Sequence, residues 1–224
     1  MSTPKKLIFL PGAGGNPAFW QPASDLLAHP ASRCLLGWPG FGVAPADPGI
    51  EGMDGLVALV LDQIDRPCAL IAQSMGGVVA VLAALKRPDL VSHLVLAVTS
   101  GGVDMADLRA EDWRSAFLAA NPTVPRWLTD YRSDLSDAIK TLRAPTLLLW
   151  GDADTISPVA VGVRLHGLLP ESSLHVIAGG GHDLANRLAA TVAPLIDAHL
   201  VSANNGAPGV VNRECPASAA STQG

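Results

Sequence analysis

The chain of 224 residues has little charge and few aromatic side chains. Charged residues make up 16% of it and aromatic residues 4%, against 49% hydrophobic residues. This composition excludes a disordered chain, because disordered chains are rich in charge and lack the apolar surface that a core needs. The formal net charge is −5, and no basic run of the nucleic-acid-binding kind is present. We therefore expect a globular protein whose partner is a small molecule and not a nucleic acid.

Long apolar runs are absent too. Mean hydropathy is +0.31, yet no stretch approaches the ~20 apolar residues of a spanning helix. The apolar run before Pro11 has only four residues, whereas a signal peptide needs an apolar region of ~7–15 residues. The three cysteines, Cys34, Cys68 and Cys215, lie far apart and form no C-x-x-C pair. We expect a cytoplasmic protein without membrane attachment, in which Cys34 and Cys68 are buried free thiols.

Short apolar runs alternate with stretches of helical character. The runs are continuously apolar, which is typical of parallel strands covered on both faces. Strands are expected at residues 6–10, 32–38, 68–73, 93–99, 146–150 and 174–178, and helices at 53–64, 75–86, 159–168 and 184–200. This alternation predicts an α/β fold with a mostly parallel, twisted sheet and helices on both faces.

One segment, residues 101–142, interrupts the alternation because it contains no convincing strand. We interpret it as a small helical insertion into a core formed by residues 1–100 and 143–202. Residues 203–224 are rich in Ala, Gly, Ser, Pro and Asn, so a disordered tail is expected there.

Two polar residues interrupt the apolar run C-A-L-I-A-Q-S-M-G-G-V-V at residues 68–79. Ser74 falls at the junction of an expected strand and an expected helix. So sharp a turn needs small neighbours, and Ala72 and Gly76 supply them, while Gly77 lets the helix lie close to the strand. The hydroxyl is then held at the carboxyl end of the sheet. The simpler alternative is a serine that only caps the helix.

The stretch A-Q-S-M-G resembles the nucleophile elbow, G-x-S-x-G, of the α/β-hydrolase fold superfamily, with Ala72 in place of the first glycine. The resemblance extends over about residues 5–200. It implies an α/β-hydrolase fold in which Ser74 is the nucleophile and residues 101–142 form a short helical lid.

The loop after the first expected strand, L-P-G-A-G-G-N-P, resembles the family's H-G-x-x turn, with Pro11 in place of the histidine. The resemblance implies an oxyanion hole formed by the backbone N–H groups of Ala13 and Met75. A dinucleotide loop is the rival interpretation, but Pro17 occupies the third glycine position of G-x-G-x-x-G.

Three further stretches match the family. G-W-P-G-F-G-V-A partly resembles its D-x-P-G-x-G-x-S turn, W-G-D-A-D resembles its G-x-x-D signature, and G-G-G-H resembles its G-H signature. They imply Asp154 as the acid and His182 as the base, in the chain order serine, acid, histidine that the family requires. Asp152 and Asp104 remain alternatives for the acid, and a turn carboxylate is the simpler interpretation of either signature aspartate.

A serine hydroxyl needs a base to take its proton, and histidine exchanges protons near neutral pH. The expected activity is therefore that of a serine hydrolase, a carboxylesterase that cleaves a small ester, thioester or amide. A lyase, a C–C hydrolase, a cofactor-free perhydrolase and a non-catalytic ligand-binding member of the fold remain alternatives. The six histidines show no H-E-x-x-H spacing, so neither a metal nor another cofactor is expected. The residues expected to bind substrate are Trp38, Phe41, Trp113 and Trp127.

Overall fold

The computed structural model describes residues 3–41, 44–201 and 210–211. Its strands form one sheet in the order β2-β1-β3-β4-β5-β6-β7, and every neighbouring pair is parallel. The strands are β1 (Lys6–Leu10), β2 (Ser32–Leu35), β3 (Cys68–Gln73), β4 (Val91–Ala97), β5 (Thr146–Gly151), β6 (Ser172–Ile177) and β7 (Val210–Val211). The expected parallel α/β sheet is thus confirmed.

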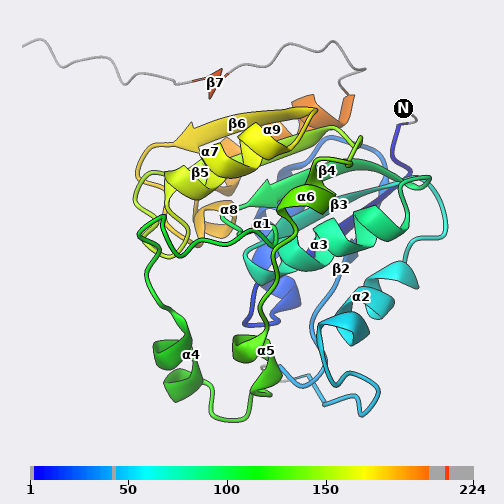
Figure 1. Cartoon of the computed structure of the whole chain (residues 1–224). Coiled ribbons are helices and arrows are strands. Elements are labelled where there is room, and N and C mark those ends of the chain that lie inside the picture. Colours follow the sequence, from blue (N-terminus) through cyan, green and yellow to red (C-terminus); the bar gives the residue numbers. More distant parts are fainter. Residues whose placement is uncertain (1–2, 42–43, 202–209, 212–224) are drawn as a thin grey trace, which may run out of the picture.

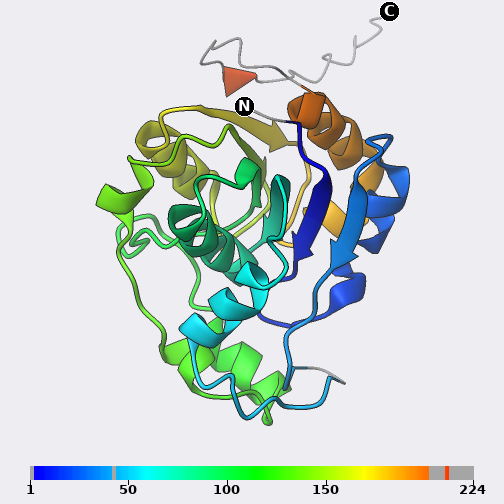
Figure 2. The same ribbon diagram turned by 90° about the vertical axis from the view of Figure 1, so that its right-hand side faces the viewer.

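Helices cover both faces of this sheet. They are η1 (Pro17–Trp20), α1 (Gln21–Leu26), α2 (Met53–Leu61), α3 (Met75–Lys86), α4 (Arg114–Ala120), α5 (Trp127–Asp130), α6 (Ser136–Ile139), α7 (Val159–Leu168), α8 (Leu184–Arg187) and α9 (Ala189–Val201). Figure 2 shows α1 and α9 on one side of the sheet and α3 and α7 on the other. Every residue of β3, β4 and β5 is buried, which explains why these runs are continuously apolar.

The segment between β4 and β5 carries α4, α5 and α6. Figures 1 and 2 both show α4 and α5 together at one end of the molecule. The arrowheads of β1 and β2 point toward that end in Figure 2, so α4 and α5 lie beyond the carboxyl ends of the strands. Helices α4 and α5 therefore stand over the edge of the sheet at which parallel-sheet proteins bind ligands.

Several element boundaries differ from those expected. The strand expected at 32–38 ends at Leu35, because the Trp38 N–H donates to the Gly15 carbonyl and draws the chain away from the sheet. The helix expected at 184–200 is divided, because Leu188 has φ −110° and ψ 34°. Helices η1 and α1 were not expected. The sequence signal for η1 is a capping residue, Asn16, followed by a first-turn proline, Pro17.

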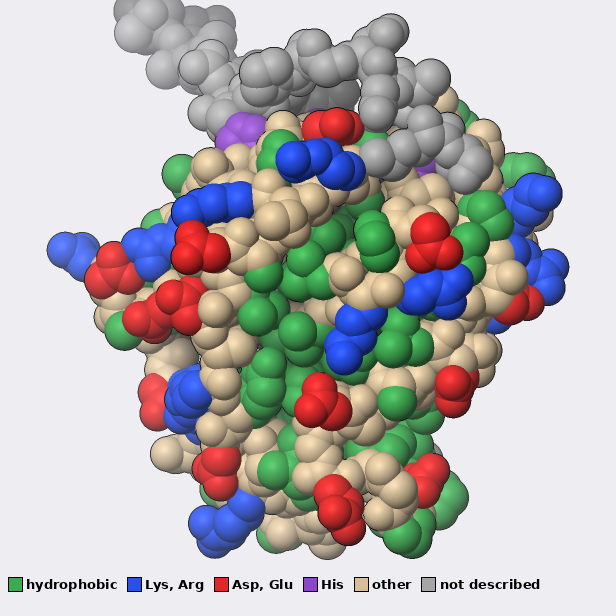
Figure 3. Space-filling view, turned by 45° about the vertical axis from the view of Figure 1, so that its right-hand side comes forward, with side chains coloured by type: hydrophobic (Ala, Val, Ile, Leu, Met, Phe, Trp, Pro, Cys, Tyr) green, Lys and Arg blue, Asp and Glu red, His purple; other side chains and the backbone are tan. Residues whose placement is uncertain are grey.

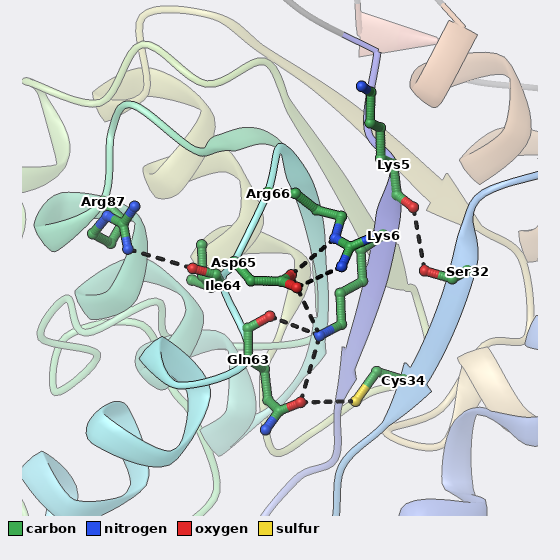
Figure 4. A network of polar contacts seen from close by, with 9 residues as sticks. All are labelled: Lys5, Lys6, Ser32, Cys34, Gln63, Ile64, Asp65, Arg66 and Arg87. Carbon is green, nitrogen blue, oxygen red and sulfur yellow. Dashed lines mark hydrogen bonds and ion pairs between the residues drawn. The ribbon is translucent and has the colours of Figure 1, made fainter.

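Cys68 is buried, and burial raises the pKa of its thiol to about 12. Cys34 is only half-buried, so the expectation of a buried thiol was wrong there: β2 is an edge strand. Its Sγ lies 3.7 Å from Oε1 of Gln63, in a network that joins β1 and β2 to the chain after α2 (Figure 4). The Lys6 ammonium donates to the Gln63 carbonyl at 2.8 Å. Cys215 and nearly all of the expected tail lie outside the described residues.

The face shown in Figure 3 carries acidic and basic side chains that are interspersed over its surface. Of the helices within the described ranges, none combines the length and the apolar character needed to cross a membrane.

Candidate active site

Ser74 stands in a sharp turn between β3 and α3. Its backbone angles, φ 52° and ψ −123°, are rare for a residue with a side chain. Although Ser74 occupies the N-cap position of α3, its side chain makes no capping hydrogen bond. The simpler interpretation as a helix cap is therefore wrong, and the hydroxyl is available to another partner.

Close packing explains the two glycines after Ser74. A Cβ atom on Gly76 would meet the Pro11 carbonyl oxygen and would lie 2.9 Å from that of Leu10. A Cβ atom on Gly77 would lie 2.6 Å from Cβ of Thr99, just after β4. The sequence indicated that α3 must approach its neighbours closely, and the structure identifies those neighbours as the ends of β1 and β4.

Three side chains from separate strand ends meet at Ser74. Nε2 of His182 lies 2.9 Å from Oγ of Ser74, and Nδ1 of His182 lies 2.8 Å from Oδ2 of Asp154. The Asp154 side chain is 1% exposed and that of His182 is 25% exposed. The other carboxylate oxygen of Asp154 accepts the N–H groups of Ile156 and Ser157 at 2.9 and 3.0 Å. An arrangement of this kind can move the hydroxyl proton to the imidazole while a buried carboxylate orients the ring.

The rival carboxylates point elsewhere. Oδ1 of Asp152 accepts the N–H of Gly179 at 2.7 Å, which joins the loops after β5 and β6. Oδ1 of Asp104 accepts the N–H of Ala106 at 3.0 Å. Asp154 is therefore the aspartate of these three that contacts the His182 ring.

The loop 11–16 lies beside Ser74, as expected. Ala13 lines the larger of two cavities described there. Met75 is the first residue of α3, so its N–H belongs to the group of helix-start amides that have no acceptor within the helix. These two amides are candidates for binding a negatively charged oxygen at Ser74.

Two cavities contact Ser74 and His182. The larger, of about 400 Å³, lies on the side of loop 11–16, and the smaller, of about 90 Å³, lies on the side of Met75. Trp113, one of the residues expected to bind substrate, lines both cavities. Sequence reasoning missed several lining residues of the larger cavity, among them Phe19, Gln73, Glu111 and Thr155. Glu111 and Thr155 hydrogen-bond to each other, which joins the segment before α4 to the loop after β5, a contact that no local pattern reveals.

Trp38, Phe41 and Trp127 line neither of these two cavities. Trp38 is fully buried, and its indole N–H donates to the Gly12 carbonyl at 2.9 Å, so it supports loop 11–16 from beneath. Phe41 is 2% exposed and contacts the Trp127 ring edge-on at 6.2 Å. Trp127 itself is only half-buried, and the substrate-binding role expected of these three aromatics stays a prediction.

No cluster of three or more His, Cys, Asp or Glu side chains able to hold a metal ion occurs among the described residues. The site can be built instead from a hydroxyl, an imidazole, a carboxylate and backbone amides, a combination suited to acyl transfer.

The chain is similar to several proteins named as hydrolases. Relatives include a pimeloyl-[acyl-carrier protein] methyl ester esterase of Aliivibrio salmonicida, 35% identical over 94 residues, which are 42% of this chain and 36% of that protein. A 2-hydroxy-6-oxononadienedioate/2-hydroxy-6-oxononatrienedioate hydrolase of Cupriavidus pinatubonensis is 25% identical and covers 77% of each chain. The chain spans 36% to 65% of the length of the first curated relatives it matches.

A solved esterase from Thermogutta terrifontis superposes with a TM-score of 0.71, at 20% identity, over 89% of this chain and 90% of that one. A parallel sheet with a serine elbow at its carboxyl edge defines the class of α/β hydrolases. A sequence model of the alpha/beta hydrolase fold matches residues 5–138, more than half of the chain. The protein belongs to the alpha/beta hydrolase fold family.

Proposed function

We propose that the protein is a serine hydrolase that cleaves a small ester, thioester or amide through an acyl-serine intermediate. The observation that carries this proposal is the pair of contacts, 2.8 and 2.9 Å long, that joins Asp154 to His182 and His182 to Ser74. Within the family, the relative named as a methyl ester esterase supports an ester as the substrate.

In the proposed reaction, the Oγ atom of Ser74 attacks the substrate carbonyl carbon while His182 takes the hydroxyl proton. Negative charge develops on the carbonyl oxygen, where the N–H groups of Ala13 and Met75 receive it. Asp154 stabilises the imidazolium as it forms. The tetrahedral intermediate then collapses, the bond to the leaving group breaks, and His182 returns the proton to that group. A water molecule, activated in the same way, hydrolyses the acyl-serine.

Turnover and active-site labelling test the proposal together. The wild-type protein should react with a fluorophosphonate probe and hydrolyse p-nitrophenyl acetate, and Ser74→Ala should lose both. Ser115→Ala is the matched control, because Ser115 is exposed on α4 and lines neither cavity beside Ser74. Wild-type protein that neither reacts with the probe nor turns over short esters would rule out the serine hydrolase.

Hydrolysis of a carbon–carbon bond is a second candidate function. The relative named as a 2-hydroxy-6-oxononadienedioate/2-hydroxy-6-oxononatrienedioate hydrolase aligns over 77% of each chain, a larger share than the esterase relative covers. Assay of such a dienoate beside p-nitrophenyl acetate separates the two functions. Turnover of the dienoate with a kcat/KM well above that for every ester tested would favour the second candidate.

A further inference from the structure

The two cavities that contact Ser74 are separate compartments. Only four of the described lining residues are common to both: Ser74, His182, Trp113 and Ile156. Ser74 and His182 form the floor at which a bond would be cleaved. The side chains of Trp113 and Ile156 therefore stand between the larger compartment and the smaller one.

Trp113 borders more of the site than its neighbours do. A third cavity, of about 270 Å³, lies under the insertion and is not lined by Ser74. Among the described residues, Trp113 alone lines all three cavities. The ring of Phe117 contacts the Trp113 ring edge-on at 5.3 Å, which supports its orientation from the next turn of α4.

Arg114 is one of six described residues that line both the smaller compartment and the third cavity, and so stand between them. Its guanidinium carbon lies 5.7 Å from the centre of the Trp113 ring. Its Nε donates to the Thr129 carbonyl at 3.2 Å, and its Nη1 donates to Asp112 at 3.2 Å. These contacts hold the guanidinium in place and support the wall that Trp113 forms.

The sizes of the compartments limit what each can hold. The smaller compartment, at about 90 Å³, has room for only a small group. The larger compartment, at about 400 Å³, has room for a much larger one. Phe19 and Phe117 line it, which favours an apolar group there.

We propose that Trp113 is a specificity-determining residue that makes the substrate asymmetric. It confines one of the two groups that flank the reacting carbonyl to the smaller compartment, while the other is a longer apolar group in the larger one. The proposal rests on the proposed function, and it names the substrate class as esters with one short side.

Three matched esters test this proposal by turnover: methyl hexanoate, pentyl acetate and pentyl hexanoate. Methyl hexanoate and pentyl acetate each have one short side, whereas pentyl hexanoate has two long sides. For at least one of the first two esters, the kcat/KM of the wild-type enzyme should be at least about tenfold above that for pentyl hexanoate. Trp113→Ala should remove most of this difference, and Trp113→Phe should reduce it in part. Leu118→Ala is the matched control, since Leu118 lies on α4, the helix that Trp113 precedes, and lines none of the three cavities. Comparable rates for all three esters in wild type would overturn the proposal.

Binding to the Ser74→Ala variant tests the compartments without turnover. Calorimetry should show 2-heptanone, with one short side, binding at least about tenfold more tightly than 6-undecanone, with two long sides. Addition of Trp113→Ala should allow 6-undecanone to bind. Equal affinities, or no binding of 2-heptanone, would overturn the partition. Selective ketone binding without hydrolysis of any ester would support the partition and reject only the proposed function.

Discussion

The side-chain amide of Gln73 donates a hydrogen bond of 3.0 Å to the backbone carbonyl of His182. Gln73 is 5% exposed, and its Oε1 atom lies so close to Gly12 that a Cβ atom there would collide with it. The residue before the candidate nucleophile thus contacts both the histidine loop and loop 11–16. Through these contacts it fixes the position of His182 relative to Ser74.

Replacement of Gln73 should therefore impair turnover more than binding. Gln73→Met keeps most of the side-chain volume but removes the donor, so we expect kcat to fall about tenfold while KM changes little. Gln73→Glu, which keeps the length and also lacks the donor, should show a similar loss. Steady-state kinetics on a short ester measure both values. Unchanged kcat in both variants would show that the hydrogen bond does not position His182.

The two neighbouring aspartates should differ sharply in their effect on catalysis. Asp154→Asn can still accept the two backbone N–H groups, but it presents an amide to Nδ1 of His182 and favours the wrong tautomer of the ring. We expect kcat to fall by about 10⁴. Asp152→Asn retains an oxygen for the Gly179 N–H and should change kcat by less than about threefold. Ester hydrolysis by the two purified variants checks this, and a larger effect at Asp152 would reassign the acid.

Local patterns in the sequence predicted much of the fold and of the site. The continuous apolar runs at β3, β4 and β5 indicated buried parallel strands, because each strand is covered on both faces. The family motifs indicated which side chains would meet. The resemblance implied that Ser74, Asp154 and His182 meet at the carboxyl edge of the sheet, where the structure has them in contact.

Features that depend on contacts between distant segments were not predictable. Trp38 is of a residue type that often lines pockets, yet its indole N–H donates to the carbonyl of Gly12, 26 residues away. Gln73 carries no local signal of its contact with His182, which lies 109 residues further along the chain. Aromatic residues fill cores and pockets alike, so their sequence positions do not distinguish the two.

Stability should respond to the glycine of the serine turn more than to a glycine in open surroundings. In Gly76→Ala the new methyl group meets backbone carbonyls of Leu10 and Pro11, which have little freedom to move. We expect a loss of about 1–3 kcal/mol in the free energy of unfolding. Gly167→Ala is the matched control: Gly167 lies in α7 with open space around it, so alanine should stabilise the helix by roughly 0.5–1 kcal/mol. Urea unfolding measures the free energy of unfolding of both variants. Equal changes in the two would show that the new methyl group at Gly76 meets no fixed obstacle.

Acid should destabilise the fold through the histidine pair formed by His93 and His199, whose rings meet edge-on at 5.3 Å. Burial lowers the pKa of both to about 4, with smaller contributions from other charges, including those of His29 and His175. The unfolded chain, in which histidine has a pKa near 6.5, binds more protons between these values. The stabilisation is therefore complete above pH ~6.5 and is lost as the pH falls toward ~4. His199→Phe keeps a ring but removes one titrating group. Between pH 7.5 and 5 the free energy of unfolding of this variant should therefore fall by about 1–2 kcal/mol less than that of wild type. Urea unfolding at the two pH values measures these free energies. Equal decreases in both proteins would show that His199 does not cause the acid sensitivity.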